Sequence, residues 1–133
     1  MAAISDLNEL VASMEPHLNE GVFVFATVGS LAEVDESSIV ALMREPEGLS
    51  VVMSEADAVR QGIAHEFRSS WITLTVTSAL EAVGLTAAFA QALGDVQISC
   101  NVIAGRHHDH IFVPTDSTDA ALAALRGLQV SAR

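Results

Sequence analysis

The sequence predicts an α+β protein in which a split βαβ unit occurs twice. Residues 71–128 show a strand pattern, a glycine loop, an amphipathic helix, two further strands and a final helix, in that order. Residues 22–63 show the order strand, loop, strand, strand, helix. No Pro- or Ser-rich linker separates the two segments, so we expect the halves, residues 1–68 and 69–133, to share a sheet or to pack tightly.

Composition limits the classes of function. The chain has 133 residues, of which 50% are hydrophobic, enough for one compact unit or two small ones with a common core. Its 17 acidic and 6 basic residues give a net charge of −11, which repels nucleic acid and anionic membrane surfaces. No apolar run approaches the roughly 20 residues that span a bilayer. The single cysteine, Cys100, and an N-terminus without a signal-peptide pattern favour a cytoplasmic protein.

The first half begins with a helix. Four apolar residues recur at helical spacing: Leu7, Leu10, Val11 and Met14. Asp6 and Glu9 are placed to cap the start of this helix, and Pro16 ends it.

Three strands and a short helix follow in the first half. Residues 22–28 are apolar on nearly both faces, which is typical of a central strand. Residues 29–38 form an acidic loop, and residues 39–43 and 49–53 are strands around a Pro-Gly turn. We expect Ser54 to cap a helix that ends near Gly62 and buries Ala56, Val59 and Ile63.

The second half has the clearer pattern. Residues 72–77 alternate strictly between apolar side chains and threonine, which predicts a strand. An apolar stripe at helical spacing predicts a helix that ends at Gly94; its members are Leu85, Ala88, Phe89, Ala92 and Leu93. Residues 98–103 and 111–113 form two more strands. Thr115 or Asp116 then caps a last helix, which carries Ala121, Leu122, Leu125 and Leu128.

Several short strings resemble a family of small bacterial tandem ACT-domain proteins. In the second half they are SALEAVGLTAAF (78–89), ISCNVIAG (98–105) and HDHIFVP (108–114); in the first half they are MEP (14–16), GVFVF (21–25) and REPEGL (44–49). The resemblance extends over residues 5–128. It implies two tandem ferredoxin-like βαββαβ units with antiparallel sheets, most similar to the ACT pairs of aspartokinases. The first unit would have a shortened crossover at residues 29–38 and an extra N-terminal helix.

The resemblance also implies a function, because ACT domains in general are regulatory modules that bind amino acids. Gly84 marks the corner where such a ligand would bind, between a strand end and a helix start. A glycine lets the ligand approach the backbone, and the free N–H groups of the first helical turn favour a carboxylate. The alternative is a glycine that only serves a tight strand-to-helix turn.

Polar residues near this corner complete the predicted ligand site. Asn101 carries both a donor and an acceptor and suits an ammonium or a polar side chain. The alternative for Asn101, and for Ser99 on the same face, is an open sheet face that contacts water or the other half of the chain. The alternative for Glu81 is an exposed loop carboxylate. The predicted ligand-binding set is Ser78, Glu81, Val83, Gly84, Leu85, Ser99 and Asn101.

The histidine-rich stretch 106–110 has the residue types that bind zinc, nickel or copper. Neighbouring positions in a tight hairpin rarely complete a tetrahedral shell alone, so we predict no metal site and no cofactor. Cys100 alternates with Ile98 and Val102 and is expected to be a buried small hydrophobic residue. No nucleophile–base pair or carboxylate pair has usable spacing, so we predict no catalytic residues and no enzyme activity.

The sequence therefore predicts a stand-alone regulatory ACT protein that binds a small amino acid. We expect a homodimer in which exposed strand edges pair across a two-fold axis. One alternative is a protein-interaction module that has no small ligand and uses the sheet face with Thr73 and Thr75. A third hypothesis is a metal-dependent activity at residues 107–110.

Overall fold

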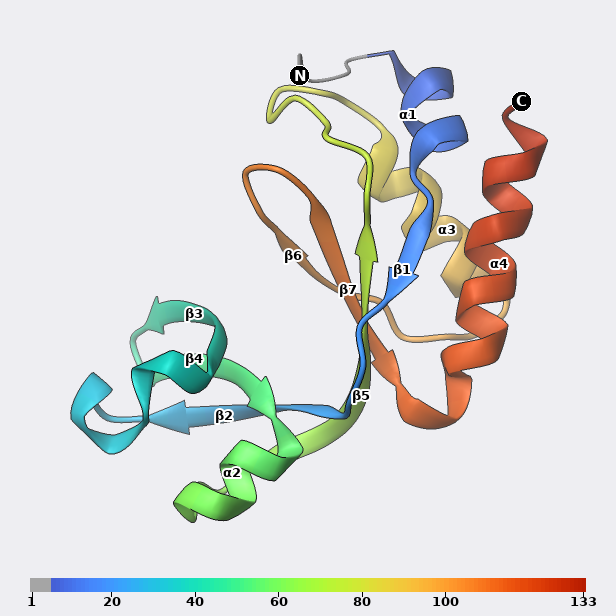
Figure 1. Cartoon of the computed structure of the whole chain (residues 1–133). Coiled ribbons are helices and arrows are strands. Elements are labelled where there is room, and N and C mark those ends of the chain that lie inside the picture. The colour runs from blue at the N-terminus through green and yellow to red at the C-terminus, as the bar shows by residue number, and fades with distance from the viewer. Residues whose placement is uncertain (1–5) are drawn as a thin grey trace.

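The strands of the protein form one seven-stranded sheet (Figure 1). The computed structural model describes residues 6–133. Its helices are α1 (Leu7–Ser13), α2 (Glu55–Gln61), α3 (Leu85–Asp95) and α4 (Thr118–Ser131), with short 3-10 turns at Leu31–Glu33, Glu36–Ser38 and Thr115–Ser117. Its strands are β1 (Pro16–Leu18), β2 (Phe23–Val28), β3 (Ile39–Glu45), β4 (Gly48–Ser54), β5 (Glu66–Leu74), β6 (Asn101–Ala104) and β7 (Asp109–Pro114). The strand order is β3-β4-β2-β5-β7-β6, with β1 also paired to β5, and every pairing is antiparallel.

Strand β5 belongs to both halves of the chain. Its first part pairs with β2, through Glu66 opposite Phe25 and Ser69 opposite Phe23. From Ser69 to Leu74 it pairs with β7. The predicted boundary between residues 68 and 69 falls inside this strand, so the two units share a sheet, which confirms the expectation from the missing linker.

The N-terminal helix packs in the second unit. The α1 side chains of Leu10 and Val11 lie in one buried cluster with Phe89 of α3 and Leu125 of α4. The side-chain amide of Gln129 in α4 donates a 3.1 Å hydrogen bond to the α1 carbonyl of Ala12. The sequence places this helix in front of the first unit, whereas in space it covers the same face of the second unit as α3 and α4 (Figure 1).

Strand β1, which the sequence pattern does not predict, gives the second unit a fourth strand. Pro16, His17 and Leu18 pair with Leu74, Thr73 and Ile72 at the end of β5. Each unit therefore has four strands and β5 counts in both, so the N-terminal segment completes the second unit.

Helix α2 starts and ends as predicted but buries a different face. The Ser54 hydroxyl accepts the Asp57 backbone N–H at 3.1 Å, and Gly62 ends the helix in the left-handed region at φ +67°. Ala58 is the buried residue and Ile63 packs half-buried against the same core, while Ala56 and Val59 are exposed, so the predicted apolar face was wrong at those two positions. A helix of two turns touches its sheet along one narrow line, which Ala58 occupies.

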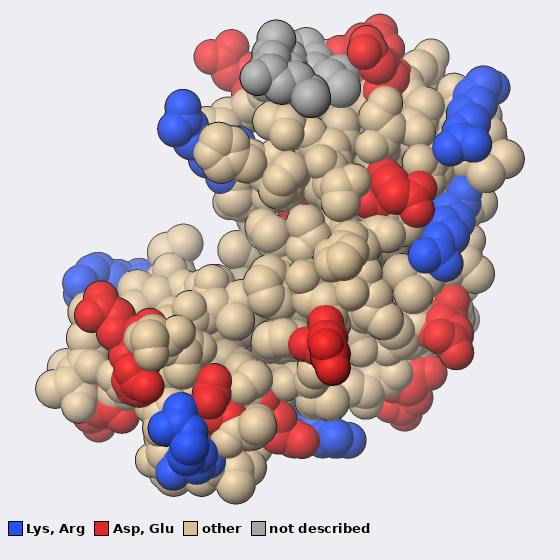
Figure 2. Space-filling view, in the orientation of Figure 1, with Lys and Arg blue, Asp and Glu red and all other residues tan. Residues whose placement is uncertain are grey.

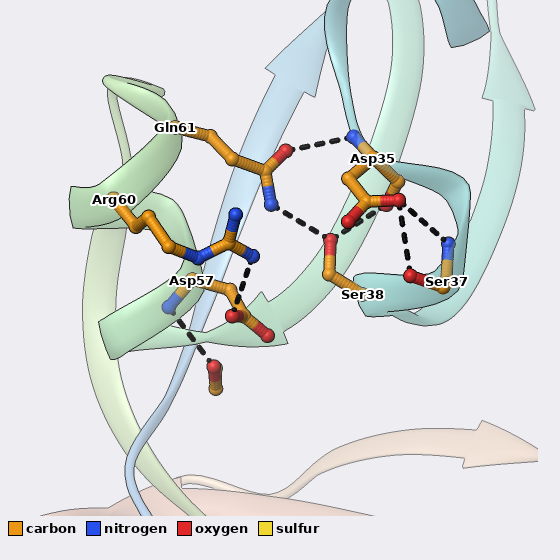
Figure 3. Close-up of polar contacts among 7 residues, drawn as sticks. Asp35, Ser37, Ser38, Asp57, Arg60 and Gln61 are labelled. Atoms are coloured by element: carbon orange, nitrogen blue, oxygen red, sulfur yellow. Dashed lines mark hydrogen bonds and ion pairs between the residues drawn. The ribbon is translucent and has the colours of Figure 1, made fainter.

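The crossover of the first unit is shortened to two 3-10 turns (Figure 3). Gln61 at the end of α2 anchors it, because its side-chain oxygen accepts the Asp35 backbone N–H at 2.7 Å and its side-chain nitrogen donates to the Ser38 hydroxyl at 3.0 Å. Asp35 also accepts hydrogen bonds from the backbone and hydroxyl of Ser37. Local polar contacts thus hold the segment where a crossover helix is missing.

The predicted elements of the second half occur with shifted ends. Strand β5 ends at Leu74 instead of continuing through the threonine alternation, and β6 begins only at Asn101. Helix α3 runs past Gly94 to Asp95 and buries Leu85, Phe89 and Leu93. The last helix, α4, begins at Thr118, where the Thr118 hydroxyl donates to the Thr115 carbonyl at 2.7 Å.

Aromatic side chains hold the two units together on the face opposite the helices. Phe23 meets Trp71 edge-on with ring centroids 5.2 Å apart, and Phe25 meets Phe112 edge-on at 5.6 Å. Trp71 and Phe112 stack at 6.1 Å. Phe67 lies in this junction with φ +63°, next to the irregular register between β2 and β5, so the shared strand bends where the two units meet.

None of the helices within residues 6–133 is long and apolar enough to cross a membrane.

Candidate functional site

Gly84 occupies the N-cap position of α3, as the sequence predicts. Its φ of +103° lies in the left-handed region, where a residue with a side chain would have a strained backbone. Among residues 6–133 no side chain accepts a hydrogen bond from this helix start, and the Gly84 carbonyl accepts the Ala88 N–H at 2.9 Å. The first turn of α3 therefore lacks a side-chain cap for its N–H groups.

Leu7 of α1 covers one side of this glycine. A Cβ built on Gly84 would lie 3.0 Å from the Leu7 Cδ2 atom. Leu7 is itself 40% exposed, so its side chain lies at the border between the corner and solvent. The N-terminal helix thus forms one wall of the predicted site, which the sequence pattern did not indicate.

Five of the seven predicted residues lie in the loop before α3 or at its first residue, Leu85. Val83 is 83% exposed, Glu81 is exposed and Ser78 is half-buried. Leu85 points into the core of the second unit with 4% exposure. The Leu85 side chain therefore cannot contact a ligand at this corner, but its backbone can.

Ser99 and Asn101 lie at the other end of α3. The eleven residues of α3 span roughly 16 Å between this end and Gly84. Asn101 is exposed, stands opposite Phe112 in the β6–β7 ladder and donates a 3.4 Å hydrogen bond to its carbonyl. Within one chain these two residues and Gly84 do not form one small pocket.

Two hollows lie away from the Gly84 corner. The larger, about 510 Å³, lies between the edge strands β3 and β6 and is mostly apolar; Figure 2 shows the surface notched between the two units. The smaller, about 470 Å³, is lined by residues of β2 and by residues 64–66. Neither is lined by a residue of the loop before α3.

His110 belongs to a polar network that sequence reasoning missed. Its Nδ1 atom lies 3.0 Å from the Trp71 indole nitrogen and 3.1 Å from the Thr73 hydroxyl. The Asn19 side-chain amide donates to the same Thr73 hydroxyl at 2.9 Å. Because an indole N–H only donates, Nδ1 must accept, so the ring is neutral with its proton on Nε2.

This network covers the sheet face that the sequence assigns to a possible protein partner. Thr73 is 9% exposed beneath Asn19 and His110, so it is not open to a partner as the alternative hypothesis requires. Thr75 is exposed, and its hydroxyl donates to the Glu15 carbonyl at 2.9 Å.

The histidine cluster is divided between two environments. His110 faces Trp71, whereas the Nδ1 of His108 lies 3.3 Å from the Val76 carbonyl in the loop before α3. Among residues 6–133, no three histidine, cysteine, aspartate or glutamate side chains are placed to hold one metal ion. Cys100 is half-buried, and burial raises the pKa of its thiol, which disfavours a reactive thiolate.

Protonation of His110 is expected to weaken the fold. Burial lowers the pKa of His110, charge on His108 lowers it further, and Asp109 opposes both. Because the folded-state pKa is below the unfolded value, the native state binds fewer protons, and stability falls as the pH drops below about 6.5. We predict that the unfolding free energy of the wild type falls when the pH is lowered from about 7.5 to about 5.5. This fall should exceed that of His110→Asn by up to about 1 kcal/mol.

The asparagine variant is the matched control for this titration. Its side-chain oxygen accepts the Trp71 indole N–H but does not ionise in this range. Urea unfolding of both proteins at the two pH values measures the difference. Equal losses in the two proteins would show that His110 does not titrate between these pH values.

Comparison with known proteins assigns both halves to one family. ACT domain models match residues 2–70 and residues 66–127. No curated protein matches the chain. A crystal structure from Vibrio cholerae, described as a protein of unknown function and a possible transport protein, is 45% identical with a TM-score of 0.83; the match covers 96% of this chain and 99% of that one.

More distant structures share the fold alone. A protein from Agrobacterium tumefaciens is 17% identical with a TM-score of 0.71, over 86% of this chain and 87% of that one. The regulatory subunit of aspartate kinase from Thermus thermophilus is 11% identical with a TM-score of 0.69, over 88% and 97% of the two chains. The family models and the shared sheet agree with the two-unit architecture. The chain belongs to the ACT domain family, as a small tandem pair of ACT units.

Proposed function

We propose that the protein is a stand-alone regulatory ACT protein that binds a small amino acid at the N-terminal corner of α3. The observation that carries this proposal is the helix start at Gly84, which no side chain of the described residues, 6–133, caps. The first-turn amides and the helix dipole favour the carboxylate of an amino acid. The exposed residues Glu81 and Val83 place the corner at the surface, so a ligand reaches it without passing through the core.

Family membership supports a regulatory role, because ACT domains are regulatory modules rather than catalytic ones. The structural neighbours include regulatory subunits of aspartate kinases. Their sequence identity to this chain is low, so the likeness is one of fold. The proposed site consists of the loop residues Ser78, Glu81, Val83 and Gly84 with the backbone of Leu85. A ligand would act by favouring one arrangement of the protein, since it shifts an equilibrium only through unequal affinity for two states.

Isothermal titration with each of the twenty amino acids tests this proposal, together with the variant Gly84→Val. We expect at least one amino acid to bind the wild type and the variant to lose that binding. A branched side chain at φ +103° strains the backbone by about 1–3 kcal/mol and moves the first-turn amides.

Gly94→Val is the matched control, because Gly94 lies in the same helix and, apart from neighbouring backbone, no atom of residues 6–133 lies within 4 Å of a Cβ built on it. Circular dichroism confirms that each variant is folded under the titration conditions. Absence of heat with all twenty amino acids, or full affinity in folded Gly84→Val, contradicts the proposal.

We further propose a homodimer formed through a free sheet edge. Strands β3 and β6 each have a single partner strand and end the sheet, and unpaired backbone groups at such edges favour pairing with a second copy. Sedimentation equilibrium measures the mass. A species of 14.0 kDa alone at all concentrations would contradict the dimer.

A protein-interaction module without a small ligand is the second candidate. The apolar hollow between β3 and β6 favours it, because Leu42, Met43 and Ile103 line this hollow and Met43 is 65% exposed. The titration with amino acids separates the two candidates, since an interaction module without a ligand gives no heat.

A further inference from the structure

The strands that end the sheet, β3 and β6, border the same hollow. Each has a single partner strand, and residues of both line the space of about 510 Å³ between the two units (Figure 2). Phe25 and Val52 line it from β2 and β4, β3 contributes residues 41–43, and β6 contributes residues 102–104. The hollow therefore combines apolar side chains with the outer edges of two strands, whose backbone groups can pair with another chain.

The register of the first unit shows which side chains of β3 border this hollow. Ala41 stands opposite Val52 of β4, and Val52 stands opposite Phe25 of β2. Residues directly opposite each other share a face of the sheet, and every second residue of a strand lies on that face. Ala41, Met43 and Glu45 thus form a row beside the hollow, in which two apolar residues are followed by a carboxylate.

Glu45 determines the charge of the hollow. Among residues 6–133 it is the only ionisable residue that lines the hollow, and its neighbour Arg44 does not line it. The Ser50 hydroxyl donates to the Glu45 Oε1 atom, which holds the carboxylate over the same sheet face. The net charge of −11 adds a field that attracts cations. The hollow is therefore complementary to a basic group that lies next to apolar ones.

We infer that β3 binds an extended, basic and apolar segment of a partner protein, which adds to the sheet as a strand. The segment lies along residues 41–45, where the pairing of β3 with β4 is regular. Its alternate side chains are apolar opposite Ala41 and Met43 and basic opposite Glu45. Backbone hydrogen bonds to the edge provide affinity, and the alternate side chains provide specificity. This surface lies apart from the Gly84 corner and does not depend on the amino-acid site.

Fluorescence anisotropy with a labelled peptide tests the charge recognition. The probe Arg-Thr-Val-Thr-Leu, or its reverse sequence for a parallel strand, presents Arg, Val and Leu on one side. It should bind roughly 2- to 5-fold more tightly than the same peptide with Gln in place of Arg, the range for a cross-strand charge pair. Glu45→Gln should remove this preference. The matched control is Glu47→Gln, which removes the same charge at an exposed position that does not line the hollow and should keep the preference.

A second pair of variants tests the apolar contact. Met43 is 65% exposed, so Met43→Ser should leave the fold intact, which circular dichroism checks. Loss of the burial of this side chain should weaken binding of the Arg peptide roughly 10-fold. Val130→Ser is the control, because Val130 is 60% exposed on α4 and should not affect binding. Strand addition should also slow hydrogen exchange at amides within residues 41–45.

Four outcomes decide the inference. Binding that depends on Glu45 and Met43 and slows exchange in β3 supports it. An unchanged preference in Glu45→Gln, or binding without slower exchange in β3, overturns it. Failure of both peptide directions to bind overturns it and leaves the amino-acid proposal standing. If β3 amides exchange slowly in a dimer that binds neither peptide, a second copy of the chain occupies this edge, which also overturns the inference.

Discussion

Replacement of Leu10 with alanine is expected to destabilise the protein by about 2–5 kcal/mol, and chiefly its second ACT unit. Leu10 is fully buried against residues of α3 and α4, although it lies in the part of the chain that precedes the first unit. Removal of its branched side chain leaves a cavity between three helices. Urea unfolding measures the loss of free energy.

Val24→Ala is the matched control, because Val24 is equally buried in the separate core of the first unit. Hydrogen exchange locates the effect of each variant, since local openings differ across a structure. Leu10→Ala should speed exchange in α3 and α4, and Val24→Ala should speed it in β3 and β4. Faster exchange in β3 and β4 alone after Leu10→Ala would contradict the assignment of α1 to the second unit.

Replacement of Phe112 with alanine is expected to destabilise the protein by about 3–5 kcal/mol. Phe112 is 1% exposed and contacts Trp71 and Phe25, so it joins aromatic side chains of both units. Loss of the ring removes contacts on both sides of the junction at once. The unfolding free energy in urea gives the magnitude.

A double-mutant cycle shows whether the junction couples the two units. Phe25 lies in β2 of the first unit and Phe112 in β7 of the second. Edge-on aromatic pairs contribute about 0.5–1.5 kcal/mol beyond burial, so the effects of Phe25→Ala and Phe112→Ala should not add. Additive effects would mean that the two rings do not stabilise each other.

Much of the fold could be predicted from local pattern. The threonine alternation indicated the last part of β5, although the strand stops at Leu74. The apolar stripe located α3, and Ser54 and Gly62 marked both ends of α2. The missing linker correctly predicted a shared sheet. These features are set by residues close in sequence, which a single chain displays directly.

Long-range features did not follow from the sequence in this way. The three residues of β1 are recognised as a strand only by their pairing with β5, more than fifty positions away. The same pairing moves α1 into the second unit, where Leu7 reaches Gly84. Local periodicity carries no information about which remote element a short segment meets.

The candidate site was predicted in part for the same reason. Gly84 lies at an uncapped helix start as expected, because a glycine before an apolar stripe is a local signal. Asn101 was grouped with it, yet the length of α3 separates the two. The contacts of His110 depend on its pairing with Thr73 of β5, which becomes visible only once the register is known.

Amide chemical shifts measured by NMR during titration with the best-binding amino acid test the central claim most directly. That claim is recognition of an amino-acid carboxylate by the first turn of α3. We predict the largest shifts at the amides of Leu85, Thr86 and Ala87, with smaller ones in the loop before them. Shifts confined to the hollow between β3 and β6, or no shift at the start of α3, would contradict it.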